Sequence, residues 1–415
     1  MTPQNVAYET ERLIAEALYH RRPVYMAFPA DLAEQPVLSR AQPVSEPVSD
    51  PDSLQATTDA VLNVLEKAKT ACILPGLLAA RTGHRGAIQA FVDASGLPFA
   101  TMFADKSVLD EQQPAYIGMY DGRLMDESVR EFVEGADLVI MICAIMSDFN
   151  SGAFTARLNP NKTVDIRHHR TIVGSKLFPN VELKDIVAAL TKRVTKRKPQ
   201  TGIKPLTTGE AQGKGNDAIS VEALYPRWEG FLKPNDIVFA ETGTSSMGLA
   251  FALLPKGASF HNQTLWGAIG WATPAAFGAA VAAPDKRVVL ITGDGSHQLT
   301  AQEIGQFGRR GLKPVVFLLN NSGYLIERLL CKDPAIAYND VASWRYSELP
   351  HALGCNGWFT ARVTNCEEFD KAIAAAHKAD GAYIEVVTDT YAASPLAQKL
   401  HDNMATLYSS NAAGL

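Results

Sequence analysis

The sequence lacks the features that mark several large classes of protein. Its five cysteines are scattered, with no pair at CxxC spacing, which argues against a zinc site or a disulfide framework and favours reduced thiols. The longest apolar run, Leu138 to Met146, falls well short of the roughly 20 residues that span a bilayer. The first residues show no basic start followed by an apolar core, so no signal peptide is predicted. A net charge of −5 gives no general attraction to nucleic acid. We therefore expect a cytoplasmic protein that binds neither membranes nor nucleic acid.

The pattern of apolar segments divides the chain into blocks. At about 150 residues per domain, a chain of 415 residues predicts two to three domains. Helix-like and strand-like segments alternate over residues 52–191 and again over 218–410, whereas residues 192–217 are rich in Lys, Arg, Thr, Pro and Gly and are predicted to be a linker. Alternation of this kind predicts an α/β fold with two doubly wound parallel-sheet domains, one central and one C-terminal.

Residues 1–40 stand apart from these two blocks. Apolar residues recur at helical spacing between positions 13 and 18, and Val24–Phe28 is predicted to be a strand that Pro29 ends. One helix and one strand cannot build a parallel sheet, which needs several such units. The segment is therefore expected to be the last part of a third domain.

The C-terminal block contains the stretch with the clearest chemistry. One apolar strand, Val288–Ile291, leads into Gly293-Asp294-Gly295, and a second, Val315–Leu319, leads into Asn320-Asn321-Ser322-Gly323-Tyr324. Ligands bind at the carboxyl ends of the strands in an open α/β sheet. Both polar clusters are therefore expected at the same edge of the sheet.

The residue types in these clusters suit a metal-bridged diphosphate. Asp294 offers a carboxylate, Asn321 an amide oxygen, and the Ser322-Gly323 turn backbone carbonyls. Mg²⁺ prefers a few hard oxygen ligands of this kind, completed by water and phosphate. Gly295 and Ser296 are predicted to open a helix whose N–H groups and dipole attract phosphate.

These motifs resemble a known family. The segment from Gly293-Asp294-Gly295 to Asn320-Asn321 resembles the cofactor motif of thiamine-diphosphate enzymes. The likeness to the pyruvate and indolepyruvate decarboxylase family extends further, over four quoted stretches: Glu241–Ser245, Trp266–Gly270, Leu299–Glu303 and Asn321–Glu327. The central block also resembles that family's central domain, notably at Gly118–Gly122, so the resemblance covers nearly the whole chain.

The resemblance implies roles for particular residues. Asp294, Asn321 and the Gly323 carbonyl would bind Mg²⁺. The diphosphate would be lined by Gly295, Ser296, Thr244 and Ser245. The Gly243 backbone would meet the aminopyrimidine, Ile269 would wedge beneath the cofactor and keep it bent, and Glu327 would be the acid/base group. Each role has a structural alternative: Asp294 as a turn residue or helix N-cap, Ile269 as a core residue and Glu327 as a solvated helical residue.

The chain also departs from the family. Only the last helix and strand of the family's N-terminal pyrimidine-binding domain match, within residues 1–40, and no residue matches the glutamate that activates the cofactor. His168-His169 lies in the central block, whereas the family's histidine pair belongs to the N-terminal domain, so a structural or surface role is expected. His297 is expected on a helix surface or near the cofactor. The chain is thus interpreted as a fragment, one half of a split enzyme, or a cofactor-binding remnant.

The resemblance implies nonoxidative decarboxylation of a 2-keto acid to an aldehyde and CO₂, with thiamine diphosphate and Mg²⁺. Indolepyruvate, phenylpyruvate, a branched-chain keto acid and pyruvate are the expected substrates. The expected assembly is a homodimer or homotetramer, or a complex with a partner chain that supplies the pyrimidine-binding domain. Two alternatives stay open: a catalytically impaired thiamine-diphosphate-binding subunit, and an acetolactate-synthase-like carboligase, which is disfavoured by the lack of a flavin signature in the central block.

Overall fold

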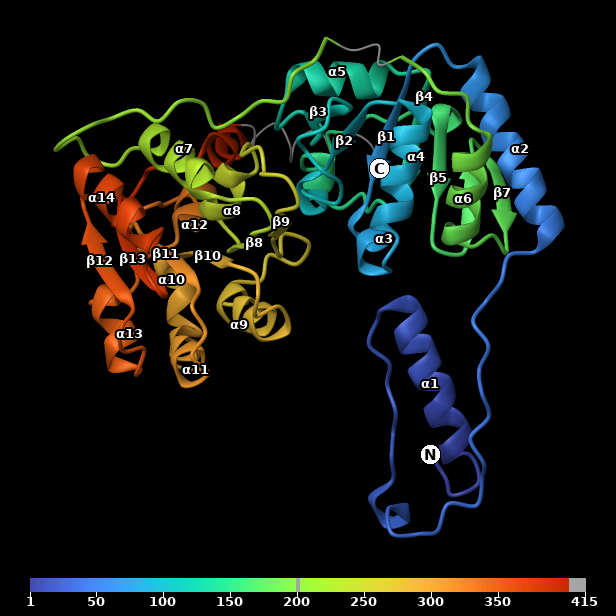
Figure 1. Cartoon of the computed structure of the whole chain (residues 1–415), viewed down its shortest axis with the longest axis horizontal. Coiled ribbons are helices and arrows are strands. Elements are labelled where there is room, and N and C mark those ends of the chain that lie inside the picture. Colours follow the sequence, from blue (N-terminus) through green and yellow to red (C-terminus); the bar gives the residue numbers. More distant parts are fainter. Residues whose placement is uncertain (199–201, 403–415) are drawn as a thin grey trace. The chain divides into compact units, whose positions relative to one another are not determined.

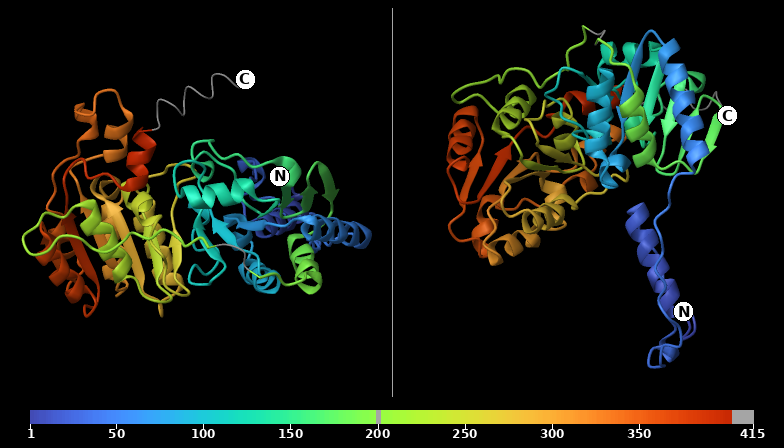
Figure 2. Two further views of the ribbon diagram at one scale, coloured as in Figure 1. Left: turned by 90° about the horizontal axis from the view of Figure 1, so that it is seen from above. Right: turned by 45° about the vertical axis from the view of Figure 1, so that its right-hand side comes forward.

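The computed structural model describes residues 1–198 and 202–402, which form two compact units (Figures 1 and 2). The first unit consists of Met1–Leu97, Asp137–Ile145 and Asn159–Lys198. The second consists of Pro98–Ala136, Met146–Leu158 and the described chain from residue 202 on. No helix in these described ranges is both long and apolar enough to cross a membrane.

A parallel sheet with an antiparallel edge forms the centre of the first unit. The strands of this sheet that lie in the first unit follow the order β1 (Ala71–Pro75), β4 (Leu138–Ile142), β5 (Thr163–Ile166), β6 (Arg170–Val173) and β7 (Lys176–Pro179). The first three strands are parallel, and β1 and β4 are buried along their whole length, as expected where helices cover both faces. The antiparallel hairpin β6–β7 is an addition that the sequence did not predict.

Except for the short helix Leu77–Arg81, which was not predicted, the helices of the first unit lie where the sequence predicts helical segments. They are α2 (Pro51–Lys67), α3 (Leu77–Arg81), α4 (Arg85–Ser95) and α6 (Leu183–Arg193). The Asp50 side chain caps α2 by accepting a hydrogen bond from the Ser53 N–H at 2.7 Å, and α6 packs against both α2 and α4. The fold class predicted for this block is thus confirmed.

The N-terminal segment differs from its prediction. Helix α1 (Val6–His20) forms as expected but buries no residue. The strand predicted over Val24–Phe28 is wrong, because these residues have no regular structure and Tyr25 is 86% exposed. Figure 1 shows the chain after α1 folding back beside that helix. A strand needs a neighbour that satisfies its backbone groups, and no strand in the described residues pairs with this segment.

The second unit is built on a fully parallel sheet. Its strand order is β12 (Phe359–Val363), β13 (Ala382–Val387), β11 (Val315–Asn320), β10 (Val288–Gly293), β8 (Ile237–Ala240) and β9 (Ser259–His261). Its longer helices are α7 (Val221–Phe231), α9 (Ala272–Ala282) and α14 (Cys366–Ala376), and its shorter ones are α8 (Thr244–Leu249), α10 (Asp294–Gln298), α11 (Ile304–Arg309), α12 (Leu325–Leu330) and α13 (Leu349–Ala352).

Helices cover both faces of this sheet (Figures 1 and 2). On one face, residues of α7 and α14 join Val289 and Ile291 of β10 in one core cluster. On the other, residues of α9 and α11 join Val288 and Leu290. Alternate residues of β10 therefore enter opposite cores, which is the pattern of a doubly wound sheet. Helix α9 is rich in small residues, which predict a tightly packed buried helix, but it buries only one face and leaves Val281 44% exposed.

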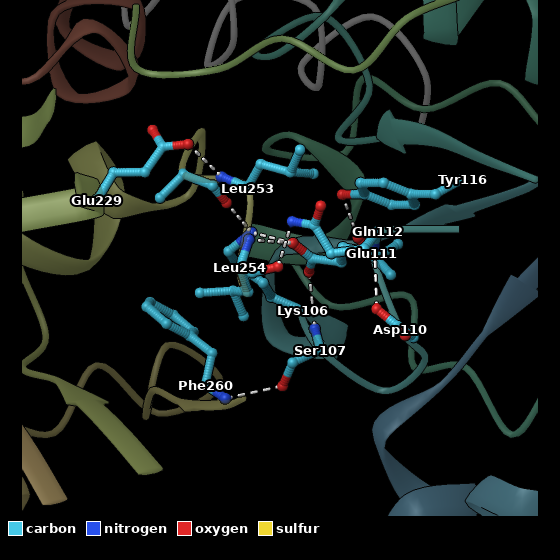
Figure 3. A network of polar contacts seen from close by, with 12 residues as sticks. Lys106, Ser107, Asp110, Glu111, Gln112, Tyr116, Glu229, Leu253, Leu254 and Phe260 are labelled. Carbon is cyan, nitrogen blue, oxygen red and sulfur yellow. Dashed lines mark hydrogen bonds and ion pairs between the residues drawn. The ribbon is translucent and has the colours of Figure 1, made fainter. Parts of the chain in front are cut away.

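Residues 98–136 belong to the second unit and contain β2 (Phe99–Thr101), β3 (Tyr116–Met119) and α5 (Glu127–Gly135). A polar network joins the loop between β2 and β3 to the chain that follows α8 (Figure 3). Lys106 Nζ donates to the Ala252 carbonyl at 2.6 Å, and the Leu254 N–H donates to Glu111 Oε2 at 3.3 Å. Ser107 Oγ accepts the Phe260 N–H at 2.8 Å. The last of these bonds satisfies a backbone N–H of edge strand β9 that has no strand partner on its outer side.

Candidate active site

The candidate site lies where the strand order of the second sheet reverses. β9 lies beyond β8, whereas β11 lies beyond β10 on the other side, so the loops after β8 and β10 diverge and leave a crevice between them. A cavity of about 480 Å³ occupies this position. All ten residues proposed from the sequence line it: Gly243, Thr244, Ser245, Ile269, Asp294, Gly295, Ser296, Asn321, Gly323 and Glu327.

Asp294 is the only acidic group among these residues that is buried. It follows β10, is 1% exposed, and each carboxylate oxygen accepts one backbone N–H: Oδ1 from Gly295 at 2.7 Å and Oδ2 from Gly323 at 3.1 Å. Burial raises the pKa of Asp294 to about 6, although these N–H donors and the positive charge of Arg328 act in the opposite direction. A bound cation would compensate for the burial of this carboxylate.

The turn after β11 has a shape that requires glycine. Ser322 has a φ of 61° and Gly323 a φ of 141°, both in the region that L side chains rarely adopt. A Cβ on Gly323 would lie 2.2 Å from the Asn339 carbonyl oxygen. The buried Asn321 and the Gly323 N–H bond to Asp294 show that this turn meets the loop after β10.

The start of α10, which directly follows β10, differs from its prediction in one respect. Gly295 does lie inside a helix, but α10 has only five residues, and the Gly295 N–H already donates to Asp294. That N–H is therefore not free for phosphate, and a helix this short carries little dipole. A Cβ on Gly295 would lie 2.4 Å from the Tyr324 ring, so glycine is required here for packing.

The loop after β8 is held by residues from distant parts of the chain. Gly243 has a φ of 123° and precedes α8. Tyr225 Oη donates to the Thr244 carbonyl at 2.8 Å, and the Ser394 N–H donates to Thr244 Oγ1 at 3.1 Å. The Thr244 hydroxyl is thus already hydrogen-bonded within the protein, whereas its neighbour Ser245 also lines the cavity.

Comparison with known proteins decides the family. The family model described as "Thiamine pyrophosphate enzyme, C-terminal TPP binding domain" matches residues 241–386, and the one described as "Thiamine pyrophosphate enzyme, central domain" matches residues 58–192. The chain is 34% identical over 381 residues to an alpha-keto-acid decarboxylase of Mycobacterium ulcerans, covering 91% of this chain and 67% of that protein. The chain belongs to the thiamine-diphosphate-dependent 2-keto acid decarboxylase family. The resemblance seen in the sequence is confirmed.

Other relatives of this thiamine-diphosphate enzyme agree. An alpha-keto-acid decarboxylase of Mycobacterium tuberculosis is 34% identical over 394 residues, covering 93% of this chain and 70% of that protein. The crystal structure of benzoylformate decarboxylase from Polynucleobacter necessarius superimposes with a TM-score of 0.72, covering 94% of this chain and 75% of that one. At 20% sequence identity, this second likeness shows the fold alone.

The cavity of this family member fits a magnesium diphosphate. Asp294 supplies one buried carboxylate, and no cluster of three or more His, Cys, Asp or Glu occurs in the described residues. Mg²⁺ commonly uses one or two carboxylates and completes its shell with phosphate and water. The absence of a Cβ at Gly323 lets the turn pack against the Asn339 carbonyl and Arg328. The hydrogen bond from the Gly323 N–H to Asp294 holds the turn beside the carboxylate.

Glu327 and Ile269 lie on the open side of the cavity. Glu327 is exposed, on α12, and its side-chain carboxylate makes no hydrogen bond or ion pair with any residue in the described ranges. Ile269 is 39% exposed, so the alternative that it is a core residue does not hold. Both side chains are accessible to a ligand in the cavity.

The structure also places residues that the sequence analysis missed or misjudged. Glu241 directly follows β8, is fully buried, and accepts N–H bonds from Thr242 and Ala272. Burial raises its pKa to about 7. His297 is fully buried rather than on a helix surface, and burial lowers its pKa to about 4. The sequence carried one signal for Glu241, its place at the start of the Glu-Thr-Gly-Thr-Ser stretch, and none for the burial of His297.

The histidine pair of the central block lies in the first unit. The ring of His168 packs 4.4 Å from the ring of Tyr19, and His169 forms an ion pair with Glu182 when protonated. Tyr19 Oη also donates to Glu182 at 2.5 Å. The pair therefore attaches α1 to the first unit, which agrees with the structural role expected for it.

Proposed function

We propose that this protein decarboxylates a 2-keto acid to an aldehyde and CO₂ with thiamine diphosphate and Mg²⁺ as cofactors. One observation carries the proposal: Asp294, which follows β10, and the Asn321–Gly323 turn and Glu327, which follow β11, line one cavity at the switch point of the sheet. Membership of the decarboxylase family supports the same reaction.

The proposed metal ligands are the Asp294 carboxylate, the Asn321 amide oxygen and the Gly323 carbonyl. Arg328 donates hydrogen bonds to the carbonyls of Asn321 and Ser322. Neither bond involves the Gly323 carbonyl. The proposed diphosphate contacts are Ser245, Ser296 and the backbone at Thr244, and Gly295, whose N–H donates to Asp294, lines the cavity next to Ser296. The Gly243 backbone is the proposed contact of the aminopyrimidine, and Ile269 is the proposed support beneath it.

Proton transfer is the proposed role of Glu327. Thiamine diphosphate, when bound, supplies the nucleophilic carbon and the electron sink that a decarboxylation requires. Glu327, whose carboxylate faces the cavity without a protein partner, would deliver a proton from Oε to the carbon that has lost CO₂ and so allow the aldehyde to form. A carboxyl within hydrogen-bond reach can perform this general acid step.

The cavity wall favours a keto acid with a large apolar side chain. Met247, Ile326, Leu330 and Tyr338 line the cavity beside Glu327, and Phe149 completes this wall. Burying an apolar side chain against such a surface contributes roughly 25 cal/mol per Å². We therefore propose that indolepyruvate, phenylpyruvate or a branched-chain keto acid is preferred over pyruvate.

Exposed apolar residues around the cavity support an assembled enzyme. Trp266 is 81% exposed and Leu299 52% exposed, close to Ile269 in the second unit. Large exposed side chains of this kind are typical of interfaces. We propose a homodimer or homotetramer, or a complex with a chain that carries the pyrimidine-binding domain, located in the cytoplasm.

The test is a product assay with a panel of 2-keto acids, thiamine diphosphate and Mg²⁺. The expected products are CO₂ and the matching aldehyde, with turnover reduced by about 100-fold or more in Glu327→Gln, as for loss of a general acid. Glu348→Gln is the matched control, since Glu348 is an exposed helical carboxylate, and it should retain full activity. Formation of an acetolactate-type product would replace the proposal by a carboligase. Cofactor binding without any product would replace it by a non-catalytic subunit.

A further inference from the structure

We propose that Arg328 and Glu385 are positioning residues of the metal-binding turn, Asn320–Gly323, and that the affinity of the site for a divalent cation depends on them. Neither residue lines the cavity. Arg328 lies on α12 and Glu385 on β13, and both hold the turn through hydrogen bonds outside the cavity. This inference rests on the proposed function, since it concerns the same metal site.

Arg328 holds the carbonyl side of the turn. It lies on α12, is 4% exposed, and its guanidinium donates to three acceptors. Nη2 reaches the Ser322 carbonyl at 2.7 Å and Asp340 Oδ1 at 2.7 Å, and Nη1 reaches the Asn321 carbonyl at 3.4 Å. The segment that contains Asp340 also pairs with the turn directly, because Gly323 and Asp340 form an isolated antiparallel β-bridge.

Glu385 holds the N–H side of the turn through Asn320. It lies on β13 and is 1% exposed. Its Oε1 accepts Asn320 Nδ2 at 2.8 Å, which fixes the orientation of that amide. Asn320 Oδ1 then accepts the Ser322 N–H at 3.3 Å. The second oxygen of Glu385 accepts the Ser347 N–H at 3.3 Å, so the carboxylate is itself fixed.

The two supports meet on one residue in a strained conformation. Ser322 has a φ of 61°, which a non-glycine residue keeps only where its surroundings determine it. Its N–H is held by Asn320 and its carbonyl by Arg328. With both peptide groups fixed, the next N–H, that of Gly323, points to Asp294 Oδ2. The proposed ligands on either side of Ser322, the Asn321 side chain and the Gly323 carbonyl, are thereby set relative to Asp294.

Residues behind the ligands of a metal site orient those ligands, and their loss typically reduces metal affinity by about 10–100-fold. We therefore expect Arg328→Met and Glu385→Gln each to weaken divalent-cation binding by about this factor. Arg328→Lys should recover part of the loss, because an ammonium can donate to one of the turn carbonyls but cannot reproduce the planar fork.

The experiment measures binding of Mn²⁺ to the full chain in the presence of thiamine diphosphate, by electron paramagnetic resonance of the free ion. Arg287→Met is the matched control. Arg287 is also a partly buried arginine that bonds a carboxylate, Asp236, and a backbone carbonyl, Phe231, but it lies at the opposite end of β10. Thermal unfolding of each variant reports its stability separately.

The expected result is a 10–100-fold weaker Mn²⁺ affinity in Arg328→Met and Glu385→Gln, partial recovery in Arg328→Lys, and an unchanged affinity in Arg287→Met even where that variant is less stable. Unchanged affinity in the folded Arg328 and Glu385 variants would overturn the inference. An equal loss in Arg287→Met would also overturn it, since the effect would then follow stability. No Mn²⁺ binding by the unsubstituted protein would instead refute the proposed function, and this inference with it.

Discussion

The buried ion pair between Lys106 and Glu111 allows a quantitative prediction about the second unit (Figure 3). Both side chains are 1% exposed and lie 2.8 Å apart. Replacing Lys106 by Met leaves the Glu111 carboxylate buried with two backbone donors, Ser107 N–H at 2.9 Å and Leu254 N–H at 3.3 Å, but no counter-charge. Removing one partner of a buried pair costs about 3–5 kcal/mol. We expect Lys106→Met to reduce the free energy of unfolding by this amount.

The double variant separates charge from packing. In Lys106→Met with Glu111→Gln no buried charge remains, and the glutamine carbonyl can still accept one of the backbone N–H groups. The Ala252 carbonyl loses its Lys106 donor in both variants, at a cost of about 1–3 kcal/mol for an unsatisfied buried group. The two variants therefore differ in the buried charge of Glu111, which only the single variant keeps. The double variant should therefore be more stable than Lys106→Met alone.

Tryptophan fluorescence during urea unfolding is the appropriate assay. All five tryptophans, Trp228, Trp266, Trp271, Trp344 and Trp358, belong to the second unit, so the signal reports the unit that contains the ion pair. A cost below about 1 kcal/mol for Lys106→Met, the range of exposed pairs, would refute the reasoning. So would a double variant no more stable than the single one.

Two further predictions concern the site itself. Burial lowers the pKa of His297 to about 4, whereas a histidine in the unfolded chain has a pKa near 6.5. Between pH 4 and 6.5 the unfolded chain therefore binds one more proton than the folded protein. The free energy of unfolding should fall by up to about 1.4 kcal/mol per pH unit as the pH decreases from 6.5 to 4. His297→Leu should flatten the pH dependence of the urea midpoint in that window, and an unchanged slope would contradict this. Gly323→Ala places a Cβ 2.2 Å from the Asn339 carbonyl oxygen. The backbone of the turn must then shift, so the variant should bind thiamine diphosphate about tenfold or more weakly in a titration. Gly311→Ala is the control in the same titration, because Gly311 also has a positive φ but has open space around it.

The β-α-β unit around Asp294 could be predicted because its signals are local. Two strands that begin with apolar runs, β10 and β11, are separated by a helical segment, and each is followed at once by polar residues that suit a metal ligand. Parallel strands bring their carboxyl ends to one edge, so proximity of the two clusters follows from the order of elements alone.

Other elements carried signals that tertiary structure overrode. Val24–Phe28 has the composition of a strand but pairs with no strand in the part of the chain that the structure describes. Ala272–Ala282 has the composition of a buried helix but buries only one of its own faces. The hairpin β6–β7 lacks an apolar run and leaves Leu177 53% exposed, so no periodicity marked it.

The supporting residues of the site could not be predicted for a different reason. Arg328 and Glu385 are far apart in the sequence and act on the same turn because β13 lies beside β11 and α12 directly follows the turn. Lys106 and Glu111 lie in an irregular segment, where nothing in the sequence distinguishes a buried ion pair from two solvated charges. Such roles depend on the register between strands and on loop paths, which composition and spacing do not encode.

The most direct test of the site is calorimetric titration of thiamine diphosphate into the protein and into Asp294→Ala, each with and without Mg²⁺. We predict that the unsubstituted protein binds thiamine diphosphate only when Mg²⁺ is present. The affinity of Asp294→Ala should be lower by at least ~10–100-fold, the factor typical for loss of a residue that only orients a metal ligand. Equal affinity in the two proteins, or binding indifferent to Mg²⁺, would contradict the assignment of Asp294 and its neighbouring turn as the magnesium-diphosphate site.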